Sequence, residues 1–259
     1  MECPKAALFD LDDTLAPPHA PISDAIAQKI KALCDRIPVG VVSAAPFARM
    51  IRDVIRQLPP DIRINNFYVF ADNGAHVRIW DNSEWRSVYL RTISVDQKTQ
   101  LRKAVLKAIQ ESGVLADAPV TGQRIVERDA GISVAALGTD APEQQRTNWD
   151  PDGKKLELLR TTIEKALPDW NVSSGSLTSV DISPKHISKA AAVWWLADHV
   201  HVPPAAILYV GVAHNSGSND HPVMATGVTS RQTKNVAETL SIMDEILTAC
   251  AAATPPSIA

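Results

Sequence analysis

FDLDDTL, residues 9–15, is the stretch of sequence that sets the expectations for the whole chain. Asp10, Asp12 and Asp13 crowd into four positions directly after the apolar run AALF. That run is too short for a helix and is typical of a buried strand. A carboxylate buried without a partner is costly, and ligands of open parallel sheets bind where the strands end. We therefore expect these acids to form part of a binding site at a strand end.

Apolar runs of strand length alternate with segments of helical periodicity in the first and last parts of the chain. Strands are expected at residues 5–10, 39–44, 66–74 and 205–211. Helices are expected at residues 23–36, 46–58, 188–200 and 235–249. Such an alternation predicts an α/β fold with a Rossmann-like parallel sheet core.

The middle of the chain has a different pattern. Residues 76–90 alternate like a hairpin, residues 97–112 and 154–167 resemble amphipathic helices, and a further strand pair is expected within 124–138. This pattern predicts an α+β cap domain inserted into the core. The expected organisation is a first core part at 1–80, a cap at 81–186, a second core part at 187–250 and a disordered tail at 251–259.

The composition is that of an ordinary globular protein of 259 residues, with 45% hydrophobic and 21% charged residues. A net charge of −3 argues against a dedicated binder of nucleic acid or of anionic membranes. Cys3, Cys34 and Cys250 are far apart, which favours neither a disulfide framework nor a zinc site and suits a reducing compartment. No signal peptide or membrane span is recognisable, so a cytoplasmic location is expected.

The chemistry that suits the opening motif is phosphoryl transfer. One carboxylate can attack phosphorus while a second transfers protons, and Mg²⁺ can offset the repulsion between them. Such a site also needs a hydroxyl and a lysine for the phosphoryl oxygens. Ser43 ends a strand, Lys189 begins a helix, and Asn219 and Asp220 follow the last expected strand. The alternative, that the acids only cap a helix, fits less well because the next helical segment starts beyond three prolines.

These parts together resemble the haloacid dehalogenase superfamily. DLDDT resembles its first motif, VVS its second, Lys189 its third and GVAHNSGSND its fourth, and the insert has the position of a type C2B cap. The resemblance implies that Asp10 is the nucleophile and that Asp12 transfers protons. It also implies phosphate-binding residues and Mg²⁺ ligands. The phosphate-binding residues would be Thr14, Ser43, Lys189 and Asn219, and the ligands Asp10, Asp12 and Asp220.

Within the superfamily the chain most resembles eukaryotic-type phosphomannomutases and their bacterial relatives, on FDLDDTLAPP, VFADNGAHV and GSNDHPV. This resemblance implies a hexose phosphate as the small-molecule substrate and a homodimer through the cap as an expected assembly. The cap residues that would bind the substrate are Arg128, Arg146, Ser179 and Asp181.

Two departures from that family pattern leave two functions open. Val212 stands where the family has a metal-binding aspartate, with Asp220 or Asn215 as replacements from the same loop, and Thr139 stands where it has a cap arginine. One hypothesis is Mg²⁺-dependent phosphoryl transfer on a hexose phosphate, as a mutase (isomerase) or as a phosphatase (hydrolase). The other is a catalytically impaired homologue that binds a sugar phosphate or a protein partner without turnover.

Overall fold

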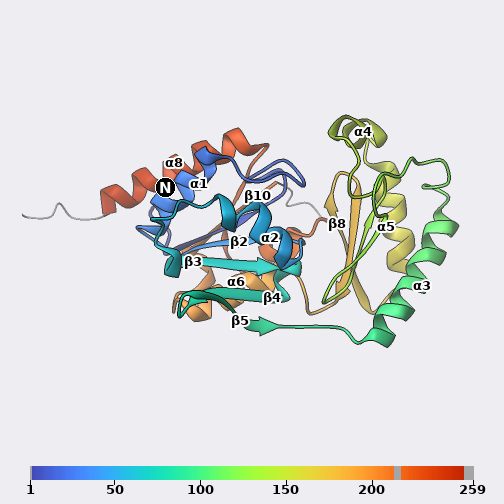
Figure 1. Cartoon of the computed structure of the whole chain (residues 1–259), viewed down its shortest axis with the longest axis horizontal. Helices are drawn as coiled ribbons and strands as arrows, with labels where there is room; N and C mark the ends of the chain where they lie inside the picture. The colour runs from blue at the N-terminus through green and yellow to red at the C-terminus, as the bar shows by residue number, and fades with distance from the viewer. Residues whose placement is uncertain (1, 213–216, 254–259) are drawn as a thin grey trace, which may run out of the picture. The chain divides into compact units, whose positions relative to one another are not determined.

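The structure is a computed structural model that describes residues 2–212 and 217–253 (Figure 1). The chain folds into two compact units, which are described separately below. The core unit comprises Met1–Leu90, Lys189–His214 and Asp220–Ala259. The cap unit comprises Arg91–Ser188 and Asn215–Asn219.

The core unit is built on a seven-stranded sheet with the order β11-β10-β1-β2-β3-β4-β5. Its parallel strands are β1 (Ala6–Asp10), β2 (Val39–Val42), β3 (Phe67–Ala71), β10 (Ile207–Gly211) and β11 (Thr229–Gln232). The antiparallel hairpin β4 (His76–Asp81) and β5 (Glu84–Leu90) extends the sheet beyond β3. The α/β expectation, with a separate α+β module inserted, is confirmed.

Helices cover both faces of the core sheet. Its helices are α1 (Asp24–Cys34), α2 (Phe47–Asp53), α6 (Lys189–His199), α7 (His221–Met224) and α8 (Val236–Ala253). In β1, Ala7 and Phe9 pack in the layer that holds α1 and α8, whereas Ala6 and Leu8 pack in the layer of α6. Because neighbouring residues of a strand point to opposite faces, a continuous apolar run is needed to fill both layers.

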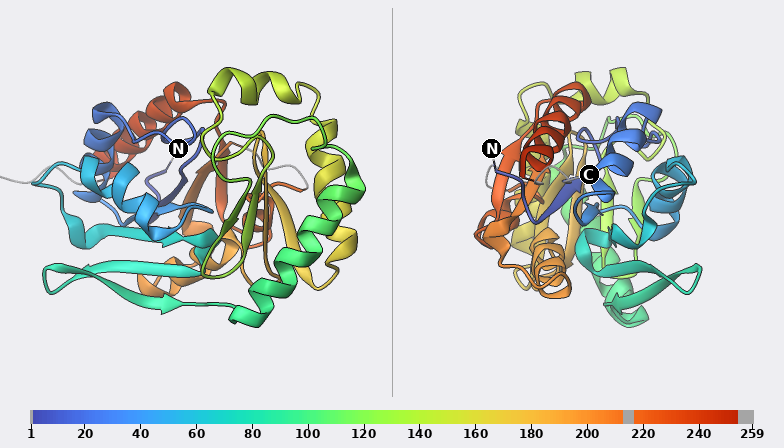
Figure 2. Two further views of the ribbon diagram at one scale, coloured as in Figure 1. Left: turned by 45° about the vertical axis from the view of Figure 1, so that its right-hand side comes forward. Right: turned by 90° about the vertical axis from the view of Figure 1, so that its left-hand side faces the viewer.

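The cap unit is a four-stranded antiparallel sheet with two long helices on one face. Its strands are β6 (Ile125–Glu127), β7 (Ile132–Ala135), β8 (Trp170–Ser176) and β9 (Ser179–Pro184), in the order β6-β7-β9-β8. Its helices are α3 (Val95–Ser112), α4 (Glu143–Trp149) and α5 (Lys154–Ala166). Figure 2 shows α3 and α5 running side by side along the sheet, where their apolar residues form the cap core.

Three features differ from the sequence expectations. The core sheet continues through Leu90 rather than ending at 80, because β4 pairs with β3 and carries β5 with it. Residues 251–253 extend α8 instead of opening a disordered tail, since alanine favours helix. Cys3 and Cys250 form a disulfide across 247 residues of sequence, and Cys34 is buried as a free thiol. The rest of the tail and Asn215 lie outside the described residues.

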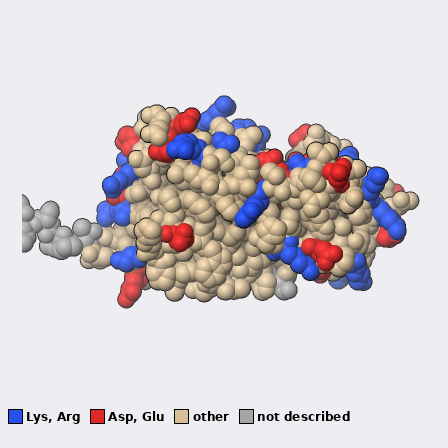
Figure 3. All heavy atoms as spheres, turned by 90° about the horizontal axis from the view of Figure 1, so that it is seen from below, with Lys and Arg blue, Asp and Glu red and all other residues tan. Residues whose placement is uncertain are grey.

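Charge and hydropathy give two further observations. On the face drawn in Figure 3, basic and acidic side chains are interspersed and neither kind gathers into one area. In the described part of the chain, no helix combines the length and apolar character that crossing a bilayer requires.

Candidate active site

The carboxyl ends of three adjacent core strands bring the expected residues to one edge of the sheet. Asp10 pairs with Val42, so Ser43 lies one residue beyond the position opposite Asp10. On the other side of β1, Phe9 pairs with Val210, which sets the end of β10 beside Asp10. The edge where ligands of parallel sheets bind therefore carries the first, second and fourth motifs.

Asp10 belongs to a buried chain of hydrogen bonds. The Lys189 Nζ donates to Asp10 Oδ1 and to Asp220 Oδ1, at 2.6 Å in each case. The Tyr209 hydroxyl, from β10, also donates to Asp220 Oδ1 at 2.6 Å. Thr14 Oγ1 donates to the other oxygen of Asp10, Oδ2, at 3.1 Å. The structure thus brings together four of the expected residues and adds Tyr209.

Burial and neighbouring charges shift the pKa values of the residues in this hydrogen-bonded group. It raises the pKa of Asp10 to about 7, with Asp220 and Asp12 adding to the effect and Lys189 opposing it. For Lys189, burial acts toward a lower pKa, but the Asp10 and Asp220 carboxylates outweigh it and the pKa lies above the usual value. Burial raises the pKa of Tyr209 well above its usual value, so the phenol stays a hydrogen-bond donor.

The end of β10 explains why a glycine is needed at Gly211. A side-chain carbon there would lie 2.4 Å from Asp220 Oδ2 and 2.9 Å from Tyr209. Val212 follows, half-buried, and its carbonyl accepts a hydrogen bond from Gln232 at 2.7 Å. Valine carries no side-chain ligand atom, so this position cannot coordinate a metal through its side chain.

Asp12 is held by a second set of charges. Arg49 on α2 donates from Nη1 to Asp12 Oδ2 at 2.9 Å and from Nη2 to Oδ1. Arg49 Nε donates to Asp53 Oδ2 at 2.9 Å. Burial acts to raise the pKa of Asp12, but the hydrogen bonds and charge of Arg49 bring it below its usual value. Asp13, next in sequence, has φ 62°, a left-handed turn that aspartate tolerates.

Sequence reasoning missed Arg49, Asp53 and Tyr209. Arg49 and Asp53 are four residues apart on one helix, a spacing that indicates a possible ion pair. Nothing in the local sequence indicated that Arg49 also reaches Asp12, 37 residues away. Tyr209 is one residue of an apolar strand, with no pattern that separates it from its neighbours.

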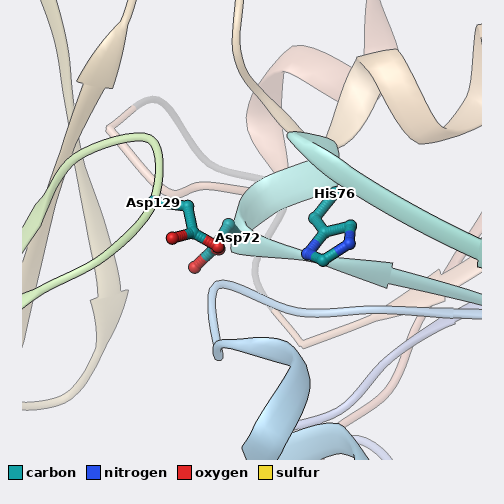
Figure 4. A group of neighbouring side chains, drawn as sticks. All are labelled: Asp72, His76 and Asp129. Carbon is teal, nitrogen blue, oxygen red and sulfur yellow. The ribbon is translucent and has the colours of Figure 1, made fainter. Parts of the chain in front are cut away.

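Ser43 lies beside a turn with a left-handed backbone. Ser43 Oγ accepts the Ala45 N–H at 3.1 Å, and its carbonyl accepts the Asn73 N–H at 2.9 Å. Asp72 and Asn73 have φ of 50° and 55°, in the left-handed region. Figure 4 draws Asp72 with His76, which follows on β4. The same figure includes Asp129, from the turn between β6 and β7 of the cap unit.

Asp181 is the centre of a polar row on the cap sheet. β9 places Asp181 between Ser133 of β7 and Ser173 of β8. Ser133 Oγ donates to Asp181 Oδ1 at 2.7 Å, and Arg128 Nη2 lies 3.1 Å from the same oxygen. Asp181 Oδ2, Ser173 Oγ and Arg128 Nε are buried without a hydrogen-bond partner in the described chain. The cap therefore has unused hydrogen-bonding capacity beside Asp181.

The other expected residues have separate surroundings. Ser179 Oγ is hydrogen-bonded to Ser176 Oγ at 2.9 Å, and Arg146 lies in the last turn of α4. Thr139 Oγ1 accepts the Gln123 N–H at 3.1 Å. Asn219 belongs to the cap unit, where its N–H donates to the Ser174 carbonyl at 3.0 Å. Within the described part of the cap unit, an ion pair thus joins Arg128 to Asp181.

Comparisons with known proteins point to one fold and one group of sequence relatives. No protein-family model matches the chain. A phosphomannomutase of Spinacia oleracea is 26% identical over 229 residues, which cover 85% of this chain and 86% of that protein. The structure of N-terminally truncated IMP-nucleotidase of Plasmodium falciparum superimposes with a TM-score of 0.73 at 16% identity, covering 95% of this chain and 70% of that one.

A second solved structure agrees with the first. A haloacid dehalogenase-like hydrolase of Bacteroides thetaiotaomicron matches with a TM-score of 0.58 at 14% identity, covering 93% of this chain and 99% of that one. At such identities the structural matches establish the fold. The chain is therefore similar in sequence to phosphomannomutases, and it has the fold of haloacid dehalogenase-like proteins.

Proposed function

We propose that the protein is an enzyme that transfers the phosphoryl group of a hexose phosphate through an aspartyl-phosphate on Asp10. The observation that carries the proposal is the buried Asp10 at the end of β1, bonded to Lys189 and Thr14 and adjacent to the end of β2. The similarity of the chain to phosphomannomutases supports a sugar phosphate as the substrate. The reaction is that of a phosphomannomutase-like enzyme or of a sugar phosphatase.

The proposed reaction has two steps. In the first, Asp12 takes up a proton from solvent, an oxygen of Asp10 bonds to phosphorus, the bond from phosphorus to the sugar oxygen breaks, and Asp12 passes the proton to that oxygen. In the second, a water or sugar hydroxyl gives its proton to Asp12 and attacks phosphorus, which frees Asp10. Lys189 and Ser43 are assigned to the phosphoryl oxygens, together with Thr14 and Asn219.

The residues at this strand end fit a magnesium ion held in part by the substrate. The Asp10 carboxylate and the Asp12 carbonyl would hold it, and Mg²⁺ sites often combine one or two carboxylates with substrate phosphates. Burial with two acids nearby raises the pKa of Asp10 to about 7, a setting that a cation would relieve. Mg²⁺ supplies charge neutralisation at the phosphoryl group. Asp220 remains the third proposed ligand of the ion, and because its Oδ1 accepts from both Lys189 and Tyr209, we propose that it also orients Lys189.

The substrate's sugar end is assigned to the cap. Arg128 and Asp181 are paired, and each keeps a buried polar atom without a protein partner among the described residues. Such atoms can bind sugar hydroxyls or phosphate oxygens without breaking the pair. Arg146 and Ser179 are assigned to the same task on the sequence resemblance alone.

The oligomeric state and the cellular location of the protein remain predictions. A homodimer through the cap would cover apolar side chains such as Leu106 of α3 and Leu158 of α5, which are 47% and 50% exposed. Light scattering on the purified protein measures the assembly, and loss of the dimer in Leu106→Glu would locate it on the cap. The expected cytoplasmic location is tested by imaging a tagged chain.

Activity assays test the proposal. The purified protein with Mg²⁺ is assayed against mannose 1-phosphate, glucose 1-phosphate and p-nitrophenyl phosphate, beside Asp10→Asn and Val212→Asp. We expect turnover that Asp10→Asn abolishes. An inactive parent together with a strongly active Val212→Asp would contradict the proposal.

One observation favours a second function. Val212 takes the place where the resembled family has a metal-binding acid, which favours a homologue that binds a sugar phosphate or protein partner without turnover. In that case the parent should bind mannose 1-phosphate in calorimetry while releasing no phosphate. Phosphate release by the parent decides against it.

A further inference from the structure

Arg49 links Asp12, the proposed proton-transfer residue, to Asp53 in the interior of the core unit. Its guanidinium group donates from both terminal nitrogens to the two oxygens of Asp12, one of these bonds being 2.9 Å. Its third nitrogen donates to Asp53 at 2.9 Å. The Arg49 side chain is 13% exposed and the Asp53 side chain is completely buried. Such a bidentate contact, called a fork below, fixes the orientation of a carboxylate as well as its position.

Asp53 in turn has little freedom. It ends α2, and its backbone carbonyl accepts the Ile22 N–H at 2.8 Å, which ties the helix to the segment that follows the opening motif. Its carboxylate also accepts hydrogen bonds from Arg52 Nε at 2.6 Å and Nη2 at 2.9 Å. A fully buried carboxylate is costly unless it is paired. Asp53 therefore stays paired with Arg49, and this pairing fixes the position of the Arg49 side chain.

We propose that Arg49 is a positioning residue for the proposed phosphoryl transfer, with Asp53 holding Arg49 and Arg49 holding the Asp12 carboxylate. The inference deepens the proposed function, because it depends on Asp12 serving as the proton-transfer group. The two steps of that reaction need Asp12 first to give a proton to the sugar oxygen and then to take one from the attacking hydroxyl. Rotation of Asp12 would break two charge-assisted hydrogen bonds, so both transfers occur with one carboxylate orientation.

The test compares the first turnover of substrates that differ in their need for Asp12 in the first step, because the second step needs Asp12 with either substrate. A sugar oxygen leaves phosphorus only with a proton, whereas p-nitrophenolate is a good leaving group without one. Misplacing a reacting group by about 1 Å can cost about 100-fold. We therefore expect Arg49→Gln to lower the first-turnover rate and kcat for mannose 1-phosphate about 100-fold, with little change in KM, and to slow the first-turnover release of p-nitrophenolate much less.

Three further variants separate positioning from charge and from folding. Arg49→Lys keeps the charge but not the fork, so we expect it to lose sugar phosphate turnover nearly as fully as Arg49→Gln. Asp53→Asn leaves the contact between Arg49 and Asp12 and should give an intermediate loss, even if Arg49→Gln fails to fold. Arg56→Gln is the matched control, because Arg56 is an exposed arginine in the short 3-10 helix that follows α2 (Ile55–Gln57), and its activity should equal that of the parent.

The outcomes are distinct. Full sugar phosphate turnover by Arg49→Lys, or an equal loss of the first-turnover rate with both substrates in Arg49→Gln and Asp53→Asn, would overturn the positioning role and leave the proposed function intact. A parent inactive on both substrates overturns the proposed function and this role with it. In the Asp12→Asn background, Arg49→Gln should not further reduce the residual hydrolysis of p-nitrophenyl phosphate, and a further loss would count against the inference.

Discussion

Replacing Asp10 by asparagine is expected to stabilise the protein at alkaline pH while it abolishes turnover. The pKa of Asp10 is raised from 3.8 to about 7, mainly because the group is buried. Between those values the folded protein keeps a proton that the unfolded chain has lost. The contribution of the Asp10 carboxyl group to stability is therefore complete below its unfolded-state pKa of 3.8. It declines as the pH rises to about 7.

The size of the effect follows from the shift. A difference of about 3 pH units at about 1.36 kcal/mol each corresponds to about 4 kcal/mol as an upper figure above pH 7. Asparagine carries no charge, and Lys189 keeps its partner Asp220. For a protein of this size about 1 kcal/mol corresponds to about 2–4 °C, so we expect Asp10→Asn to raise Tm by roughly 10 °C at about pH 8.

Thermal unfolding in EDTA buffers measures this prediction, with parent and variant compared from about pH 5 to about pH 8. The gain should shrink as the pH falls, because the parent's carboxyl group becomes protonated and uncharged like the amide. Asp117→Asn, at an exposed position, is the control for the loss of an acidic residue and should show no such trend. A Tm difference for Asp10→Asn that is negative at alkaline pH, or that grows toward acid, would refute the reasoning.

Three other changes have defined outcomes. Lys189→Met leaves the carboxylates of Asp10 and Asp220 buried without their cation, so we expect the free energy of unfolding, measured with denaturant, to fall by about 3–5 kcal/mol. A smaller decrease than that caused by Lys107→Met, at an exposed lysine, would contradict this expectation. Val212→Asp adds a carboxylate beside the strand end and should tighten Mg²⁺ binding in calorimetry about tenfold or more, with unchanged affinity as the opposing result. Cys250→Ser removes the disulfide to Cys3 and should cost about 2–5 kcal/mol, an effect that a strong reductant should reproduce in the parent and should not add to in the variant.

The strand-end residues could be predicted because their positions follow from local sequence. Asp10 directly ends an apolar run, and Lys189 begins a helix whose apolar residues are easily recognised. In a parallel sheet such ends converge on one edge, so the order of motifs along the chain was enough to predict that Asp10, Lys189 and Asp220 meet. The fold class followed from the same alternation of strands and helices.

The missed contacts depend on side chains that meet across the fold. Arg49 lies on the helix that the sequence predicts at residues 46–58, yet its guanidinium group binds Asp12 across the fold. Tyr209 is one of several apolar residues in β10, and only the sheet's packing turns its hydroxyl to Asp220. The pairing of Cys3 with Cys250 requires the two ends of the core unit to meet, which no spacing in the sequence reveals.

The extent of the core sheet was also hidden from the sequence. Residues 76–90 read correctly as a hairpin, but a hairpin pattern does not state which sheet it joins. The pairing of β4 with β3 places it in the core, because Tyr68 and Phe70 lie opposite Ile79 and Val77 and share their packing layer.

The central claim, that Asp10 becomes phosphorylated, is tested most directly by trapping the phosphoenzyme. The protein is incubated with Mg²⁺ and mannose 1-phosphate, quenched in acid, and analysed by intact and peptide mass spectrometry. We predict a mass increase of one phosphoryl group on the peptide that contains Asp10, absent from Asp10→Asn. Turnover of the substrate without such an adduct, or an adduct that persists in Asp10→Asn, would contradict the claim.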